Sequence, residues 1–263
     1  MALDTVLSIL LSPLLLAQTA WTLRSAERLP EPTGDRFGLV GQGPHLRFLQ
    51  LGDSSCVGVG VASQHEALAP KLSSNLGDVF SVSWTLIGEN GATTEDAARL
   101  LEPIKHDQFD AAYVIFGVND VKNLRRIGHW RRDYRKLIDI LKDRHGVQIV
   151  YVSGLPPVGE FPLMPNPLRF LFSMRARRFD RALQCVTKDI SNCHHLPISA
   201  GLNPAYMASD GFHPGEGMYS EWADVAAAQM LPKFAKLNLT SPNHPNHKAQ
   251  NNNDHIESDS ACQ

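Results

Sequence analysis

A serine hydroxyl that could act as a nucleophile follows a short apolar run. Leu46–Leu51 is mostly apolar, as expected of a buried strand, and Gly52, Asp53 and Ser54 after it force a tight turn before the next helix. Ligands of open α/β sheets bind at the carboxyl ends of strands, where we expect this hydroxyl. Gly-Asp-Ser is also a common turn sequence, so the assignment depends on other segments.

A histidine and an aspartate near the end of the chain could activate that serine. A serine is a poor nucleophile until a base removes its proton, and His213 is the candidate base. Asp210 precedes it by three residues, a spacing that can bring the carboxylate to the ring nitrogen facing away from the serine. Pro214 suits the first position of a following helix. The same segment alone would also fit an ordinary turn before a helix.

Two further segments complete a recognisable set. Gly91 lies in Gly-Glu-Asn-Gly-Ala-Thr-Thr, and Asn119 lies in Phe-Gly-Val-Asn-Asp. With Ser54 and the Asp210–His213 segment, they resemble in order the four blocks of the SGNH hydrolases, also called the GDSL esterase/lipase family. The resemblance covers about Arg47 to Phe234, and the combination is far more specific than any single block. It implies an α/β fold, a three-layer sandwich with a flavodoxin-like, five-stranded parallel sheet.

The resemblance also implies a serine esterase that works through an acyl-enzyme. Ser54 would attack the ester, His213 would accept and return the proton, and Asp210 would orient the imidazole. The tetrahedral oxyanion would bind the backbone N–H groups of Ser54 and Gly91 and the side-chain amide of Asn119. Each of these donors lies just past the carboxyl end of a predicted strand, so the three can meet at one rim of the sheet.

Neighbouring residues compete for these roles. Ser55 is a second hydroxyl, but the family pattern puts the nucleophile directly after Gly-Asp, which favours Ser54; leucine is frequent where this chain has Ser55. Cys56 is interpreted as a small buried residue. Asp53 and Asp120 are interpreted as capping or supporting groups. A second function class is a membrane-tethered, non-catalytic binding or scaffold protein on the same fold, which the four intact blocks disfavour.

Other enzyme classes lack their motifs here. An α/β-hydrolase elbow needs G-x-S-x-G, but Asp53 precedes Ser54 and Cys56 stands at the second glycine. A dinucleotide site needs G-x-G-x-x-G, and Ser63 replaces the third glycine after Gly58 and Gly60. Neither a Walker A sequence nor H-E-x-x-H is present. The proposed mechanism needs no cofactor and no metal.

Alternating strand and helix patterns predict one hydrolase domain. Apolar runs predict strands at 46–51, 79–87, 111–116, 147–152 and 195–198. Helical spacing predicts helices at 63–76, 94–101, 134–141, 174–190 and 215–234. This order favours a parallel sheet covered on both faces. We assign 29–36 to a turn-rich linker, 37–236 to the hydrolase domain and 237–263 to a disordered polar tail.

The first 28 residues form an apolar segment that we interpret as a membrane anchor or interfacial helix. Thr5–Leu23 contains no charged residue and as a helix would be about 28 Å long, close to the hydrocarbon thickness of a bilayer. Asp4 disfavours a cleaved signal peptide. Arg24 and Arg28 would place the main domain in the cytoplasm. The alternatives are a helix buried against the domain and a soluble cytoplasmic protein.

The net charge of the chain limits the classes of partner that it is expected to bind. A net charge of −2 over 263 residues gives no attraction to nucleic acid, so we expect a small-molecule or lipid ester as the partner. The four cysteines show no C-x-x-C pair and are expected to be unpaired.

The apolar, proline-containing segment 158–172 would line an acyl pocket, form a lid or pack on the core. The basic face of helix 174–190 is a solvated surface or, alternatively, contacts anionic lipid.

Overall fold

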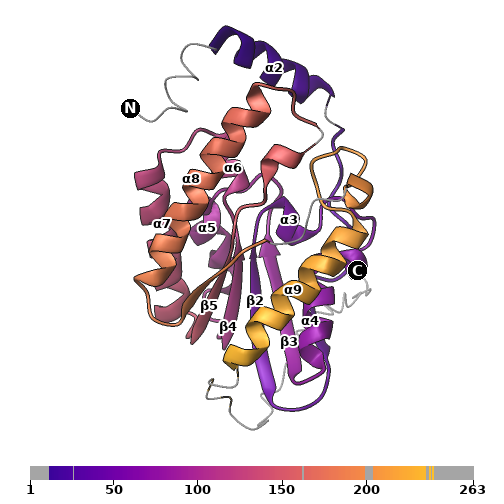
Figure 1. The fold of residues 1–263 in the computed structure, drawn as a ribbon. Coiled ribbons are helices and arrows are strands. Elements are labelled where there is room, and N and C mark those ends of the chain that lie inside the picture. The colour runs from indigo at the N-terminus through magenta and orange to yellow at the C-terminus, as the bar shows by residue number, and fades with distance from the viewer. Residues whose placement is uncertain are drawn as a thin grey trace, which may run out of the picture.

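The structure, a computed structural model, describes residues 12–25, 27–161, 163–198, 204–234, 237 and 239. Within them, strands form one sheet and helices cover both of its faces (Figure 1). The strands are β1 (Phe37–Val40), β2 (His45–Gly52), β3 (Ser81–Gly88), β4 (Ala111–Ile115), β5 (Ile149–Ser153) and β6 (Cys193–Leu196). The helices are α2 (Ser12–Ser25), α3 (Ser54–Val57), α4 (Leu68–Gly77), α5 (Ala97–Leu101), α6 (Val118–Lys122), α7 (Ile127–Asp143), α8 (Leu168–Lys188) and α9 (Glu216–Phe234).

The sheet confirms the five predicted parallel strands and adds one. Its order is β1-β3-β2-β4-β5-β6, and all neighbours are parallel except β1, which pairs antiparallel with β3. The five-stranded prediction therefore needs a correction to six strands. β1 escaped prediction because it is four residues long, contains Gly38 and follows a turn-rich segment. As an edge strand it leaves Phe37 and Leu39 exposed.

Two apolar clusters, one on each face of the sheet, make the three layers. Every residue of β4 and β5 is buried, as expected for parallel strands covered on both sides. On β2, Leu49 and Leu51 pack toward α5, α7 and α8, whereas Leu46 and Phe48 pack toward α4 and α9. Figure 1 shows α7 and α8 on one side of the sheet and α4 and α9 on the other. Because successive side chains of a strand point to opposite faces of the sheet, one strand contributes residues to both apolar clusters.

The long helix α8 begins earlier than the sequence pattern predicts. It starts at Leu168, so the last third of the apolar segment 158–172 is helical. Phe161 and Met164 are buried, whereas Phe170 is exposed. Packing on the core is therefore the main role of the buried residues of this segment, and Phe161 also lines the pocket described below.

The N-terminal region packs along the domain where it is described. The Gln18 side chain of α2 donates to the Asn166 carbonyl and accepts from the Leu168 N–H. Among the described residues, no helix has both the length and the apolar character needed to cross a bilayer. In the segment 29–36, the Thr33 carbonyl accepts from the Gln64 N–H at 2.8 Å. Residues 1–11 of the predicted anchor segment and nearly all of the tail 237–263 lie outside the described residues.

Candidate active site

Ser54 is the first residue of α3, immediately after β2. Asp53 caps this short helix, because its carboxylate accepts the Ser55 N–H at 3.1 Å. The Asp53 N–H donates to the Ile115 carbonyl of β4 at 3.0 Å, which fixes the turn to the neighbouring strand. As the first N–H of a helix, the Ser54 N–H has no intrahelical acceptor. The hydroxyl thus stands at the carboxyl edge of the sheet, where the sequence predicts it.

The imidazole of His213 joins Ser54 to Asp210. Its Nε2 lies 3.1 Å from Ser54 Oγ, and its Nδ1 lies 2.5 Å from Asp210 Oδ2. The other carboxylate oxygen, Oδ1, accepts the N–H groups of Phe212 and His213, both at 2.9 Å. Burial acts to raise the pKa of Asp210, but these hydrogen bonds outweigh it and hold that pKa below its usual range. The carboxylate is therefore ionised at neutral pH.

We call the chain of contacts from Ser54 through His213 to Asp210 the relay. Close backbone packing brings its Ser54 and His213 segments together. Gly60 has φ +113°, and a Cβ at this position would lie 2.1 Å from the Pro214 carbonyl oxygen. Only glycine permits this approach between the Ser54 and His213 segments. The Tyr219 hydroxyl adds a hydrogen bond to the Val59 carbonyl at 2.7 Å. The aromatic ring of Phe212 packs edge-to-face against Phe161, which braces the histidine turn.

Asn119 reaches the pocket from α6 and also holds the Gly91 loop. Its side-chain N–H donates to the Ala92 carbonyl at 3.0 Å, which leaves the second amide hydrogen for another acceptor. Asp120 accepts both the N–H and the hydroxyl of Thr94, at 3.1 and 3.0 Å. Gly91 itself is exposed, has φ +83° and does not line the pocket. The structure thus links the Gly91 loop to Asn119 through Ala92.

Two buried aspartates, Asp53 and Asp120, have raised pKa values. Burial raises the pKa of Asp53 to about 7, although the Ser55 N–H acts in the opposite direction. Burial also raises the pKa of Asp120 to about 6, against the hydrogen bonds from Thr94. Both carboxyl groups therefore change charge nearer to neutral pH than ordinary aspartates do. Their contacts are those of capping and loop-tying groups.

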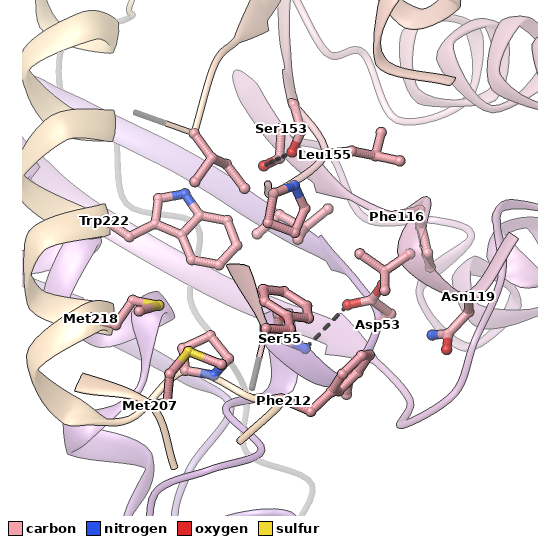
Figure 2. Close-up of a pocket in the computed structure, with 18 residues that line it drawn as sticks. Asp53, Ser55, Phe116, Asn119, Ser153, Leu155, Met207, Phe212, Met218 and Trp222 are labelled. Carbon is pink, nitrogen blue, oxygen red and sulfur yellow. Dashed lines mark hydrogen bonds between the residues drawn. The ribbon is translucent and has the colours of Figure 1, made fainter. Parts of the chain in front are cut away.

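An apolar pocket opens beside Ser54. Figure 2 shows Asn119 and Asp53 toward one end of it and Trp222, Met218 and Met207 toward the other. Trp222 and Met218 of α9 and the loop after β5 also line the pocket, although no sequence motif predicts them as pocket residues. That loop, Gly154-Leu-Pro, follows a strand in the same way as the predicted blocks, and this position was the available signal.

A second aspartate–histidine pair supports the wall of this pocket. Asp180 Oδ1 lies 2.8 Å from His195 Nε2 and accepts the Leu155 N–H at 3.0 Å. Burial acts to raise the pKa of Asp180, but hydrogen bonds, first that of His195, lower it. No sequence motif marks this pair, because its members come from α8 and β6.

The cysteines behave as predicted where they are described. Cys56, Cys185 and Cys193 are free thiols, and Cys56 is buried with 1% of its surface exposed. Burial raises the pKa of Cys56 well above its ordinary value, so it stays a neutral thiol. Cys262 lies outside the described residues.

Comparisons with known proteins agree with this architecture. A GDSL-like esterase of Mycobacterium tuberculosis is 29% identical over 197 residues, an alignment that spans 68% of this chain and 60% of the relative. A carbohydrate acetylesterase family member from Sinorhizobium meliloti superposes with a TM-score of 0.57 at 16% identity, covering 72% of this chain and 99% of that chain. A lipase/acylhydrolase from Enterococcus faecalis gives 0.57 at 17% identity, over 75% and 100%.

At such low identities the solved structures establish the likeness of the fold alone. Family membership comes from sequence. The profile of the GDSL-like Lipase/Acylhydrolase family matches residues 51–220, which is more than half of the chain and includes all four blocks. The chain therefore belongs to the GDSL-like lipase/acylhydrolase family.

Proposed function

We propose that this protein is a serine esterase that hydrolyses carboxylic esters through an acyl-enzyme. The observation that carries the proposal is the continuous relay from Ser54 Oγ through His213 to Asp210, with separations of 3.1 and 2.5 Å. Both distances are within reach for proton transfer and orientation. Membership of the GDSL-like family supports ester hydrolysis independently of this geometry.

The relay supplies a base and then an acid. As Ser54 Oγ bonds to the ester carbonyl carbon, its proton passes to His213 Nε2, while Asp210 stabilises the imidazolium through Nδ1–H. The tetrahedral intermediate collapses, the ester C–O bond breaks, and the imidazolium protonates the departing alcohol. Water then attacks the acyl-serine with the same imidazole as base, which releases the acid and restores the Ser54 hydroxyl.

The oxyanion of that intermediate needs hydrogen-bond donors already in position. We assign this role to the Ser54 N–H at the start of α3, the Gly91 N–H and the side-chain amide of Asn119. The hydrogen bond from Asn119 to Ala92 and the contacts of Asp120 with Thr94 would hold the Gly91 loop in a fixed position relative to α6. This preorganisation is what a charged transition state requires.

An active-site fluorophosphonate probe tests the proposal. The probe phosphonylates only an activated serine, so the wild-type chain should be labelled and Ser54→Ala should not. Ser55→Ala is the matched control, because it removes the neighbouring hydroxyl and keeps the N–H that Asp53 accepts; it should still be labelled. A folded wild-type sample that does not react would refute the esterase and favour a non-catalytic binding protein.

A further inference from the structure

The pocket beside Ser54 has its polar groups concentrated at one end. Asp53, Ser54, Ser55 and Asn119 are among the lining residues, and Figure 2 shows Asp53 and Asn119 toward the end opposite Trp222. The remaining polar side chain of the lining, Ser153, already donates to the Gly154 carbonyl at 3.1 Å. The rest of the wall is apolar, with residues such as Leu155, Phe161, Ile198, Met207, Met218 and Trp222.

This distribution suits an acyl chain better than a sugar. A carbohydrate needs hydrogen-bond partners for its hydroxyls, and among the described residues the far wall has few polar side chains, of which the Ser153 hydroxyl and the Trp222 N–H already donate within the protein. The position of the base agrees with this assignment. His213 must protonate the departing alcohol, and its Nε2 lies 3.1 Å from Ser54 Oγ. With the alcohol oxygen at the imidazole, the apolar wall remains for the acyl group.

The indole of Trp222 forms the far wall. In Figure 2 it extends from α9 into the pocket, well separated from Asn119 at the opposite end. Its Nε1–H donates to the Tyr113 hydroxyl at 2.9 Å, and its ring stacks on Tyr219 with an interplanar angle of 10°. These contacts from β4 and from α9 itself fix one orientation of the indole.

A second, smaller cavity lies behind this wall. Trp222 and Ile198 line both cavities, and Tyr113, Leu196 and Ala226 help to line the second one. The indole is therefore a partition between two mostly apolar spaces. Removing it would join them and lengthen the space available to a chain that starts at Ser54.

We infer that the substrate is an ester of an unbranched aliphatic acid and that Trp222 sets the upper limit of the acid's chain length. This inference rests on the proposed function. Each methylene that enters the apolar pocket should raise kcat/KM by about fourfold, the factor that corresponds to burying one CH₂ group. The gain ends where the chain reaches the indole. Trp222 acts on specificity and takes no part in bond breaking.

The test is kcat/KM for p-nitrophenyl acetate, butyrate, hexanoate, octanoate, decanoate and laurate. For the wild-type protein we expect a rise along the series to a maximum and then a fall. Trp222→Ala should move the maximum to a longer ester and raise kcat/KM for the first ester beyond the wild-type maximum by about tenfold or more. Trp222→Phe, a smaller change, should shift the profile in the same direction. Trp21→Ala, at an exposed tryptophan of α2, is the control and should keep the wild-type profile.

Each outcome separates the two proposals. If Trp222→Phe and Trp222→Ala are both active and keep the chain-length maximum of the wild type, the proposed limit on chain length is refuted. The proposed esterase function is then unaffected. If Trp222→Ala fails to fold in a thermal melt, the Trp222→Phe profile alone decides. A wild-type preference for an acetylated sugar over all longer acyl esters would refute the aliphatic substrate. Failure of the wild type to cleave any ester, with no fluorophosphonate labelling, would overturn the proposed function and this inference with it.

Discussion

Replacing Asp210 by asparagine should separate the two roles of this carboxylate. Oδ1 accepts two backbone N–H groups, whereas Oδ2 faces only Nδ1 of His213. An asparagine can keep its oxygen on the backbone groups, and its NH₂ then faces Nδ1. Because an NH₂ group can only donate, the imidazole must carry its proton on Nε2 instead of Nδ1. In that tautomer Nε2 cannot accept the proton of Ser54.

The expected loss is large in rate and small in stability. Holding the wrong tautomer should lower kcat by about 10⁴-fold, the size of effect known for this substitution in serine-protease triads. That factor corresponds to about 5 kcal/mol of activation free energy. The fold loses one charge-assisted hydrogen bond and keeps the two backbone contacts, so the free energy of unfolding should fall by only about 1 to 3 kcal/mol.

The assay is kcat for a p-nitrophenyl ester together with the rate of fluorophosphonate labelling and a thermal melt. Asp110→Asn is the matched control, since Asp110 is also a buried, hydrogen-bonded aspartate but precedes β4 at the opposite edge of the sheet and pairs with Arg47. It should lower stability and keep kcat. A folded Asp210→Asn protein with kcat within about tenfold of wild type would show that Asp210 only caps the turn, and the relay would be refuted.

Three further substitutions probe the surroundings of the relay. Asn119→Ala should lower kcat by about 100- to 1,000-fold as one oxyanion donor is lost, and unchanged turnover would remove Asn119 from the site. Gly60→Ala forces a Cβ against the Pro214 carbonyl and should destabilise the fold by about 2 kcal/mol or more in a denaturant titration, whereas Gly128→Ala, whose Cβ meets nothing within 4 Å, should be tolerated. The raised pKa of Asp53, about 7, means that the folded state holds its proton more tightly than the unfolded chain, so stability should fall as pH rises from about 4 to 7. Asp53→Asn should remove the contribution of Asp53 to this slope, leave that of Asp120, whose pKa is also raised, and gain up to roughly 4 kcal/mol above pH 7. An unchanged slope in urea titrations would contradict the assignment.

The sequence predicted the central elements of the fold because their signals are local. β4 and β5 are continuous apolar runs, and their burial on both faces follows from that pattern alone. Ser54, Asn119 and the Asp210–His213 segment could be named because each follows a predicted strand or carries a short motif. β1 could not be predicted, since a four-residue edge strand with half of its side chains exposed has little apolar periodicity.

The parts of the site that were missed depend on contacts between distant segments. Trp222 looks like any apolar residue of α9 until the fold sets its indole against Tyr113, which is 109 positions away in the chain. Asp180 and His195 likewise meet only after α8 and β6 have packed together. Gly60 carries no motif, and its requirement for glycine arises from the approach of Pro214. Such constraints are properties of tertiary packing and leave no periodic trace in the sequence.

The wide separation of Ser54 and His213, 159 positions along the chain, has a consequence during biosynthesis. Translation delivers Ser54 well before His213, so a ribosome-bound intermediate would carry an unactivated serine among partly formed strands. Chemical competence would then arise late, when the segment around Pro214 docks against the Gly60 turn. The nascent polypeptide would thereby be kept from attacking cellular esters before it is fully folded.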